Sequence, residues 1–454
     1  MQELGGANLG DRRRTDRLVA MGTRAAAAPA GNITAVFGVA AEREAAYRFV
    51  ENDDVAAGEI TASAARATIA RGREFSFVFA PLDGSSLNMG DANGAKRLGR
   101  VGTRKANAQG LQVMTAIGVS PDGTPLGILG QHYWTRDRTG PRKKNSRNKR
   151  RVEDKETVHW LTVMDQAKTA AASTPAGSQL WFQLDRGGDA WPVLETFGNG
   201  PHWTTVRASW DRRLVTTDPE QRYLWETMEQ APLRGAYTME VPASPDGKRT
   251  ARTALMLVRA AQVTLDLVAK PSTRRAPTVL GAVWVCEHGS CPEGEEPIEW
   301  LLLTDYPVHT FDDARLVIFG YQQRWRIEQF HRTWKSGACN AEDNQLGDRD
   351  HIIIWVTLLA SVAMRILRLT YLARNRPDDP ATVELTHHEV DAAILVSETK
   401  TFRRGARLTI AQAVHLIALC GGYTGKSSGG PPGAVVLARG LRKIATVAKI
   451  LEKL

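Results

Sequence analysis

The sequence predicts an α/β fold in which a mixed sheet flanked by helices is interrupted by a β-rich insertion and bounded by helical domains at both ends. Over residues 71–350, short apolar segments that end in turn residues alternate with longer helical patterns. Residues 214–299 are β-rich and punctuated by turns, whereas residues 1–70 and 351–454 show mostly helical patterns. We therefore expect a helical domain over 1–70, an α/β core with its insertion over 71–350, and a second helical domain over 351–454.

The N-terminal domain is rich in Ala and Arg. We expect one helix to open within Asp11–Val19, which carries four arginines, and another to cover Glu42–Val50. Small helical domains with clustered Arg often lie against phosphate backbones. A solvated, Arg-rich helix face explains the same pattern equally well, so this domain alone leaves both interpretations open.

The core begins with strand patterns, two of which end at an acid. The expected elements are a strand over Glu74–Asp83, a hairpin of Leu111–Val119 and Pro125–Tyr133, a helix over Val152–Ala172, and strands over Gln179–Asp185 and Trp300–Asp305. Side chains that follow strands at one edge of a sheet are where α/β proteins place their chemistry. Asp83 and Asp185 are therefore candidate functional residues, although either is also explained as a turn residue or a helix N-cap.

A stripe of polar residues follows the last of these strands, in a helix expected to start near Phe311. Tyr321, Arg324, Glu328 and Lys335 have the spacing Y-x2-R-x3-E-x6-K in a segment without Gly or Pro. At about 100° per residue, all four fall on one face of a helix. An Arg324–Glu328 pair on a solvated face is the simpler interpretation, with a stabilisation of only about 0.2–0.5 kcal/mol.

Three carboxylates from separated elements, Asp83, Asp185 and Glu328, have the chemistry of a metal site. Hard cations such as Mg²⁺ or Mn²⁺ take oxygen ligands, and two such ions activate an attacking oxygen and stabilise a leaving oxygen at a phosphodiester. We expect Mg²⁺, with Mn²⁺ as a substitute and two ions per site. No nucleophilic Ser or Cys is required by such chemistry.

Composition narrows the partner and the compartment. The net charge of +10 and the pI near 9.5 favour a polyanionic partner without separating DNA, RNA and anionic membranes. Four scattered cysteines indicate free thiols in a reducing compartment. The apolar stretch His351–Ala373 is interrupted by Arg365 and Arg368, which predicts a buried helix and not a membrane span. Since the N-terminus also lacks a signal-peptide pattern, we expect a cytoplasmic protein with no membrane partner.

Longer motifs in the chain match a known family. The chain resembles the cut-and-paste transposases of bacterial insertion sequences that carry a D-D-E triad and a Y-R-E-K signature, and within them the Tn-five type of the IS-four group. The matching segments are Leu9–Val19, Ala46–Phe49, Asp83, Asp185–Asp189, Trp300–Thr304 and Arg324–His331. The last motif is the longest, and it follows two matching acids in the family's order.

The resemblance implies that Asp83, Asp185 and Glu328 form the catalytic triad on an RNase H-like core. In the family, water nicks the element's end, the freed 3′-hydroxyl attacks the opposite strand to give a hairpin, and water reopens it before strand transfer. The implied partners are transposon end DNA, target DNA and a second copy of the chain, in a synaptic homodimer formed through the C-terminal domain. That domain matches the family only weakly.

The resemblance also assigns DNA contacts. Tyr321, Arg324 and Lys335 are expected to hold phosphates near the hairpin, and Trp300 to stack on a base removed from the duplex. Trp325 is expected to assist this step, although each tryptophan is also explained as a core residue. The same motif places Arg326 and His331 among the expected DNA contacts.

A basic run outside the family pattern completes the candidate DNA contacts. The segment 142–151 has seven cations in ten residues, among them Arg142, Lys143, Lys144, Arg150 and Arg151. We interpret it as a loop that contacts DNA phosphates without sequence preference, the alternative being a charge run with no partner.

Two other functions stay open from the sequence. The first is an inactive or domesticated relative that binds terminal repeats without cutting them, which the intact triad disfavours. The second is an RNase H-like nuclease without transposition, which the N-terminal domain and the insertion disfavour.

Overall fold

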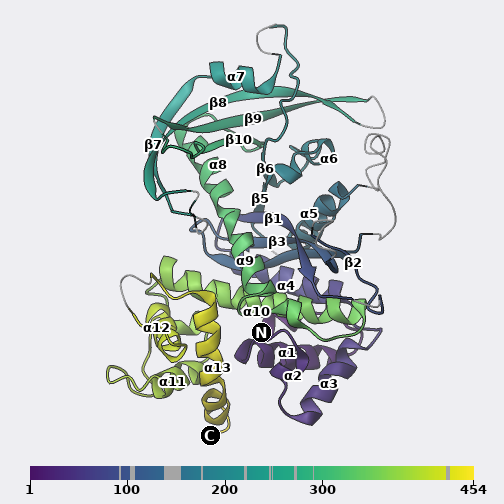
Figure 1. Ribbon diagram of the computed structural model, residues 1–454, viewed down its shortest axis with the longest axis vertical. Coiled ribbons are helices and arrows are strands. Elements are labelled where there is room, and N and C mark those ends of the chain that lie inside the picture. Colours follow the sequence, from purple (N-terminus) through teal and green to yellow (C-terminus); the bar gives the residue numbers. More distant parts are fainter. Residues whose placement is uncertain are drawn as a thin grey trace.

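A single mixed sheet runs through the middle of the molecule, with helices on both of its faces and at both chain ends (Figure 1). This computed structural model describes residues 1–91, 94–102, 108–136, 155–174, 177–218, 222–244, 247, 249–269, 274–289, 291–425 and 430–454. The expected α/β class, with a mixed sheet and helical ends, is confirmed.

The sheet has the strand order β2-β3-β1-β5-β6-β10-β9-β8-β7, and β4 pairs with β3 off this path. Its strands are β1 (Phe77–Asn88), β2 (Gly99–Arg100), β3 (Gln109–Val119), β4 (Pro125–Trp134), β5 (Gln179–Leu184), β6 (Trp203–Arg207), β7 (Leu233–Val241), β8 (Arg252–Val268), β9 (Arg275–His288) and β10 (Glu299–Thr304). The β1–β5 and β5–β6 pairs are parallel, and the other pairs are antiparallel.

The β-rich character expected for residues 214–299 is confirmed by β7, β8 and β9, with the short helix α7 (Leu224–Gln230) beside them. These strands do not form a sheet of their own. They continue the core sheet through β9, which pairs with the whole length of β10, from Glu299 opposite Cys286 to Thr304 opposite Gly281. The insertion therefore extends the sheet outward from β10.

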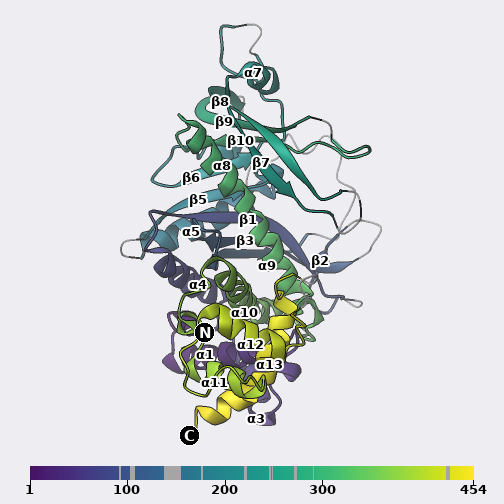
Figure 2. The ribbon, with the colours of Figure 1, turned by 90° about the vertical axis from the view of Figure 1, so that its left-hand side faces the viewer.

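Alternation along β1 assigns the two faces of the sheet. Phe79 and Leu87 point into the core beneath α8 (Phe311–Gln323), α9 (Trp325–Lys335) and the helical ends. Val78 and Ala80 point into a second core beneath α5 (Thr157–Ala172) and α6 (Trp191–Leu194). Period-two alternation is what a strand buried on both faces requires. Figure 2 shows α8 and α9 descending in line across the sheet.

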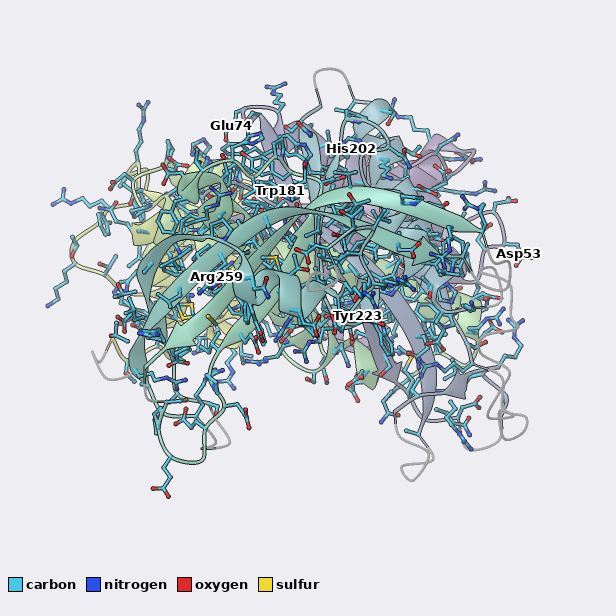
Figure 3. The ribbon with its side chains drawn as sticks, turned by 90° about the horizontal axis from the view of Figure 1, so that it is seen from above. Asp53, Glu74, Trp181, His202, Tyr223 and Arg259 are labelled. Carbon is cyan, nitrogen blue, oxygen red and sulfur yellow. The ribbon has the colours of Figure 1, made fainter. Side chains whose placement is uncertain are left out.

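Aromatic side chains fill the core under α8. Trp181 of β5 is fully buried, stacks on Tyr306 at 4.3 Å between ring centroids, and meets Phe77, Phe79 and Trp203 at 5.4–5.6 Å. Seen from above, Trp181 lies well inside the outline of the molecule (Figure 3). This cluster anchors the parallel strands β1 and β5, which position the first two candidate acids.

The N-terminal and C-terminal helices both pack against α10 (Arg349–Asn375), below the sheet in Figure 1. The N-terminal helices are α1 (Arg12–Ala27), α2 (Ile33–Val36), α3 (Ala40–Val50) and α4 (Ala57–Gly72), and the C-terminal ones are α11 (His387–Val396), α12 (Ile410–Cys420) and α13 (Ala434–Leu451). By length and composition α10 would cross a membrane, but 94% of its apolar window is buried inside the protein. The expected buried helix agrees with this arrangement.

Two arginines on α10 are satisfied by acids in the adjoining segment. Arg368 donates to both carboxylate oxygens of Glu384, at 2.6 and 2.7 Å, and to the carbonyl of Leu126 in β4, at 2.9 Å. Arg365 lies 3.3 Å from Glu384 and 2.9 Å from Glu389. Because all four charged side chains are largely buried, each depends on its partners for solvation.

Several boundaries differ from those expected. The hairpin and the strands ending near Asp185 and Asp305 are confirmed. Asp83 does not end its strand: β1 continues five residues further, to Asn88, because residues 84–88 stay paired with β3. The helix expected from Phe311 is divided at Arg324 into α8 and α9. Of the helix expected over 152–172, residues 152–154 lie outside the described part of the chain, and α5 begins at Thr157.

The buried ion-pair network predicts a large effect of a small change. Glu384→Gln leaves Arg365 and Arg368 without their shared anion, so we expect the free energy of unfolding to fall by about 3–5 kcal/mol. Chemical denaturation followed by far-UV circular dichroism measures it. The exposed Asp378→Asn change is the matched control, and equal midpoints for the two variants would contradict the prediction.

Candidate active site

The first two candidate acids come from neighbouring parallel strands. Asp83 lies in β1 on the face covered by α9, and its Oδ1 accepts a hydrogen bond from its neighbour Gly84 at 2.7 Å. Asp185 follows β5, which pairs in parallel with β1, and its Oδ1 accepts from the amide of Gly187 at 2.7 Å. Asp185 is thus an N-cap of the turn Arg186–Gly188, as one interpretation of the sequence held, while lying beside Asp83.

The third acid reaches the same place from the helix. Arg324, at the junction of α8 and α9, donates to Asp83 Oδ2 at 3.1 Å and to Glu328 Oε1 at 2.7 Å. The exposed fractions of the side chains are 8% for Arg324, 20% for Asp83 and 38% for Glu328. One guanidinium therefore joins acids that are 245 positions apart in the sequence. The Arg324–Glu328 pair, which a solvated helix face would also explain, is here combined with a contact to Asp83 in the sheet.

The pKa of Asp83 reflects its burial and the charges around it. Burial raises the pKa of Asp83 to about 7, Asp185 and Glu328 act in the same direction, and Arg324 opposes them. Like charges raise a carboxyl pKa because each makes the ionised form of the other less favourable. The three acids of the expected triad therefore form one electrostatic cluster on the α9 side of β1 and β5.

The donor chemistry of this cluster fits a divalent cation. Carboxylate oxygens are the ligands that Mg²⁺ and Mn²⁺ prefer, and a cation offsets the repulsion among the three acids. Among the described residues, however, no three His, Cys, Asp or Glu side chains converge in a metal-binding geometry. The Arg324 guanidinium lies between two of the three acids. The three carboxylates that a metal ion would need are therefore present, but they do not converge on one point.

The remaining stripe residues lie around the same cluster. Tyr321 is buried, and burial raises the pKa of its hydroxyl, which lies close enough to Arg324 and Asp185 for both to affect it. Its ring makes an edge contact with Trp300 of β10 at 5.7 Å between centroids. Lys335, about two helical turns beyond Glu328, places its Nζ 3.3 Å from Ser85 Oγ in β1. The face predicted from the spacing is therefore the face that packs on the sheet.

Arg207 is a cation of the site that sequence reasoning missed. It ends β6, donates to the carbonyl of Glu299 at 2.7 Å and lies close enough to Tyr321 to lower its pKa against the effect of burial. The parallel β5–β6 register places it next to the end of β5, where Asp185 follows. The sequence signal for Arg207 is its position: it ends a strand that follows the strand before Asp185. This signal can be used only when β6 has been recognised as a strand.

The other residues of the long motif lie in different surroundings. Trp325 has an exposed fraction of 51% and lies 5.1 Å from the Arg324 guanidinium, so it faces solvent beside the cluster. Arg326 donates to the carbonyl of Gly123 at 3.1 Å and lies 4.2 Å from the ring of Tyr371, away from the acids. His331 is buried, and its ring lies 5.4 Å from that of Phe330 between centroids.

The second acid of the segment Asp185–Asp189 has a structural position. Asp189 is buried and accepts from the amides of Ser209 and Trp210, at 2.6 and 3.1 Å, and from the guanidinium of Arg212. It thereby fixes the chain that leaves β6 after Arg207. The basic run with Arg142, Lys143, Lys144, Arg150 and Arg151 lies outside the described residues.

Burial of His331 predicts a pH dependence of stability. Burial, and next the charge of Lys335, lower the pKa of His331 to about 3, compared with about 6.5 for an unfolded histidine. The unfolded state therefore binds the proton first, and stability is lost as pH falls from about 6.5 towards 3. We expect a loss of about 2–3 kcal/mol at pH 4.5 from this residue.

Denaturation midpoints of His331→Phe, measured between pH 7 and pH 4.5, test this expectation, because phenylalanine keeps the ring but not the titration. The variant is expected to lose less stability over that interval than the unchanged protein. An identical loss in both proteins would contradict the assignment.

One comparison with known proteins bears on this chain. A family model described as transposase DNA-binding matches residues 1–55, which contain α1, α2 and α3. These are the Arg-rich helices for which the sequence left DNA contact and a solvated face equally open. The match favours DNA contact, and it identifies the N-terminal part of the chain as similar to the DNA-binding part of transposases.

Proposed function

We propose that this protein is a cut-and-paste DNA transposase that uses Asp83, Asp185 and Glu328 to cleave and join phosphodiesters. One observation carries the proposal: acids from β1 and α9 share the Arg324 guanidinium, and Asp185 at the end of β5 lies close enough to Asp83 to raise its pKa, in a chain whose residues 1–55 match a transposase DNA-binding model. The topology, with parallel strands β1 and β5 delivering two of the acids, is consistent with the RNase H-like core that we infer from the resemblance.

The three acids would hold Mg²⁺, or Mn²⁺ in its place, most simply as two ions. When bound, such ions stabilise the charge that develops at phosphorus and lower the pKa of an attacking water. The protein's own part is to position the phosphodiester for in-line attack by water and then by the freed 3′-hydroxyl. Successive displacements at one site account for nicking, hairpin formation, hairpin opening and strand transfer with a single set of acids.

The residues around the acids fit the handling of a distorted DNA end. Arg207, Arg324 and Lys335 supply cations for backbone phosphates, and Tyr321 supplies a hydroxyl. Trp300 lies at the edge of this group, in ring contact with Tyr321, where it would stack on an unpaired base. We further propose that the protein acts as a homodimer on two transposon ends, which must be paired before they are joined to target DNA.

A cleavage assay on DNA bearing the native element's terminal repeats, with Mg²⁺, tests this function. We expect hairpin-ended products from the unchanged protein and a loss of at least about a hundredfold in rate for Glu328→Gln, because the amide is a poor metal ligand and carries no charge. The exposed Glu226→Gln change in α7 is the control and is expected to cleave normally.

The same assay separates the alternatives. Binding of the repeats without cleavage by any variant would favour a DNA-binding relative that has lost its chemistry. Cleavage that ignores the repeats and leaves no hairpins would favour a nuclease without transposition.

Trp300 provides an independent test of the hairpin step. Stacking on an unpaired base is worth about 1–3 kcal/mol, so Trp300→Ala is expected to slow hairpin formation by about 5- to 150-fold while first-strand nicking continues. Trp300→Phe is expected to restore part of the rate. Equal slowing of nicking and hairpin formation in a time course on denaturing gels would assign Trp300 to the core instead.

A further inference from the structure

The guanidinium of Arg324 occupies a position that two carboxylates share. Its Nη1 lies 3.1 Å from Asp83 and its Nη2 lies 2.7 Å from Glu328, so a single positive charge neutralises part of the cluster. The third nitrogen, Nε, is buried and has no hydrogen-bond partner among the described residues. The group is therefore held by two contacts and retains one donor for a further acceptor.

The Arg324 side chain lies between the acids and the half-exposed ring of Trp325. It forms the junction between α8 and α9, and the Trp325 ring beside it, half exposed to solvent, lies 5.1 Å from the guanidinium. A cation that leaves the carboxylates can move along this aromatic face towards solvent, where a planar guanidinium is well accommodated. A DNA phosphate arriving from solvent would meet it there.

The charges of Arg324 and of the three carboxylates make the position of the arginine depend on what else binds the acids. Asp83, Asp185 and Glu328 carry more negative charge than Arg324 can neutralise, and Asp185 has no ion pair within the described chain. Removing Arg324 alone would leave two partly buried acids without a partner, which is unfavourable. The exchange becomes favourable when a phosphate takes the guanidinium and a divalent cation takes the carboxylates.

We propose that Arg324 is an internal cation that closes the carboxylate cluster until DNA is bound, so that DNA and the divalent cation bind cooperatively. This inference rests on the proposed function in taking DNA as the substrate. Arg324 acts here as a positioning residue: it passes from Asp83 and Glu328 to a phosphate, and it leaves both acids free as ligands. Coupling between two sites is reciprocal, so the metal must strengthen DNA binding by the same factor.

Mn²⁺ binding to the full chain, followed by electron paramagnetic resonance of the free ion, tests the proposal. We expect Mn²⁺ to bind the unchanged protein weakly without DNA, and about 5- to 150-fold more tightly when a short duplex is present at saturation, as judged by fluorescence anisotropy. In Arg324→Gln, we expect tighter Mn²⁺ binding without DNA and little further effect of the duplex.

Two further variants keep the test decisive. Arg332→Gln removes the same charge from an exposed side chain in the last turn of α9 and should retain the coupling. Arg324→Lys keeps the charge but cannot bridge two carboxylates with one planar group, so its coupling should be intermediate. Circular dichroism confirms that each variant is folded, and the lysine variant carries the test if the glutamine variant is not.

Two outcomes would overturn the proposal. One is equal Mn²⁺ affinity of the unchanged protein with and without bound duplex. The other is a duplex effect of the same size in Arg324→Gln, which would mean that phosphate ligates the metal without the arginine. Because no step of this test involves cleavage, a protein that shows the coupling but never cuts DNA would support the inference and overturn the proposed function.

Discussion

Close approach of α8 to the parallel strands determines where Tyr321 and Arg324 lie relative to the acids. A Cβ on Gly320 would come within 2.6 Å of the Phe79 ring in β1 and 3.0 Å of the Gln183 amide in β5, so only glycine allows this separation. The next turn of the same helix carries Tyr321 and Arg324. A larger residue at 320 would lift the helix from the sheet and separate the arginine from Asp83.

The sequence could predict much of this arrangement because its signals are local. The turn at Pro121–Gly123 and the runs on either side of it define the β3–β4 hairpin, and the spacing from Tyr321 to Lys335 defines one helix face. The position of Asp83 within β1 was not predictable, because strand length there depends on pairing with β3 and not on composition. Likewise, no local pattern shows that β9 would add to β10.

The candidate site shows the same division. Spacing predicted that Arg324 and Glu328 would be neighbours, but not that Asp83 would share the guanidinium, which depends on how α8 crosses β1. Arg326 and His331 belong to the same sequence motif. Helical geometry nevertheless directs Arg326 towards the turn of the β3–β4 hairpin and His331 into the core. A motif that is continuous in the sequence therefore combines residues that contact the acid cluster with residues whose side chains lie elsewhere.

The continuous sheet also bears on how such a chain can change over time. The free edge of a sheet is where strands can be added without breaking existing pairs. Strands β9, β8 and β7 succeed one another outward from β10, so within the sheet each is hydrogen-bonded to the strand before it. The insertion can therefore lengthen or shorten from β7 inward while β10, with Trp300, stays in register with β6. Variation among descendants of this sequence should concentrate at that outer margin and spare the strands nearest the acids.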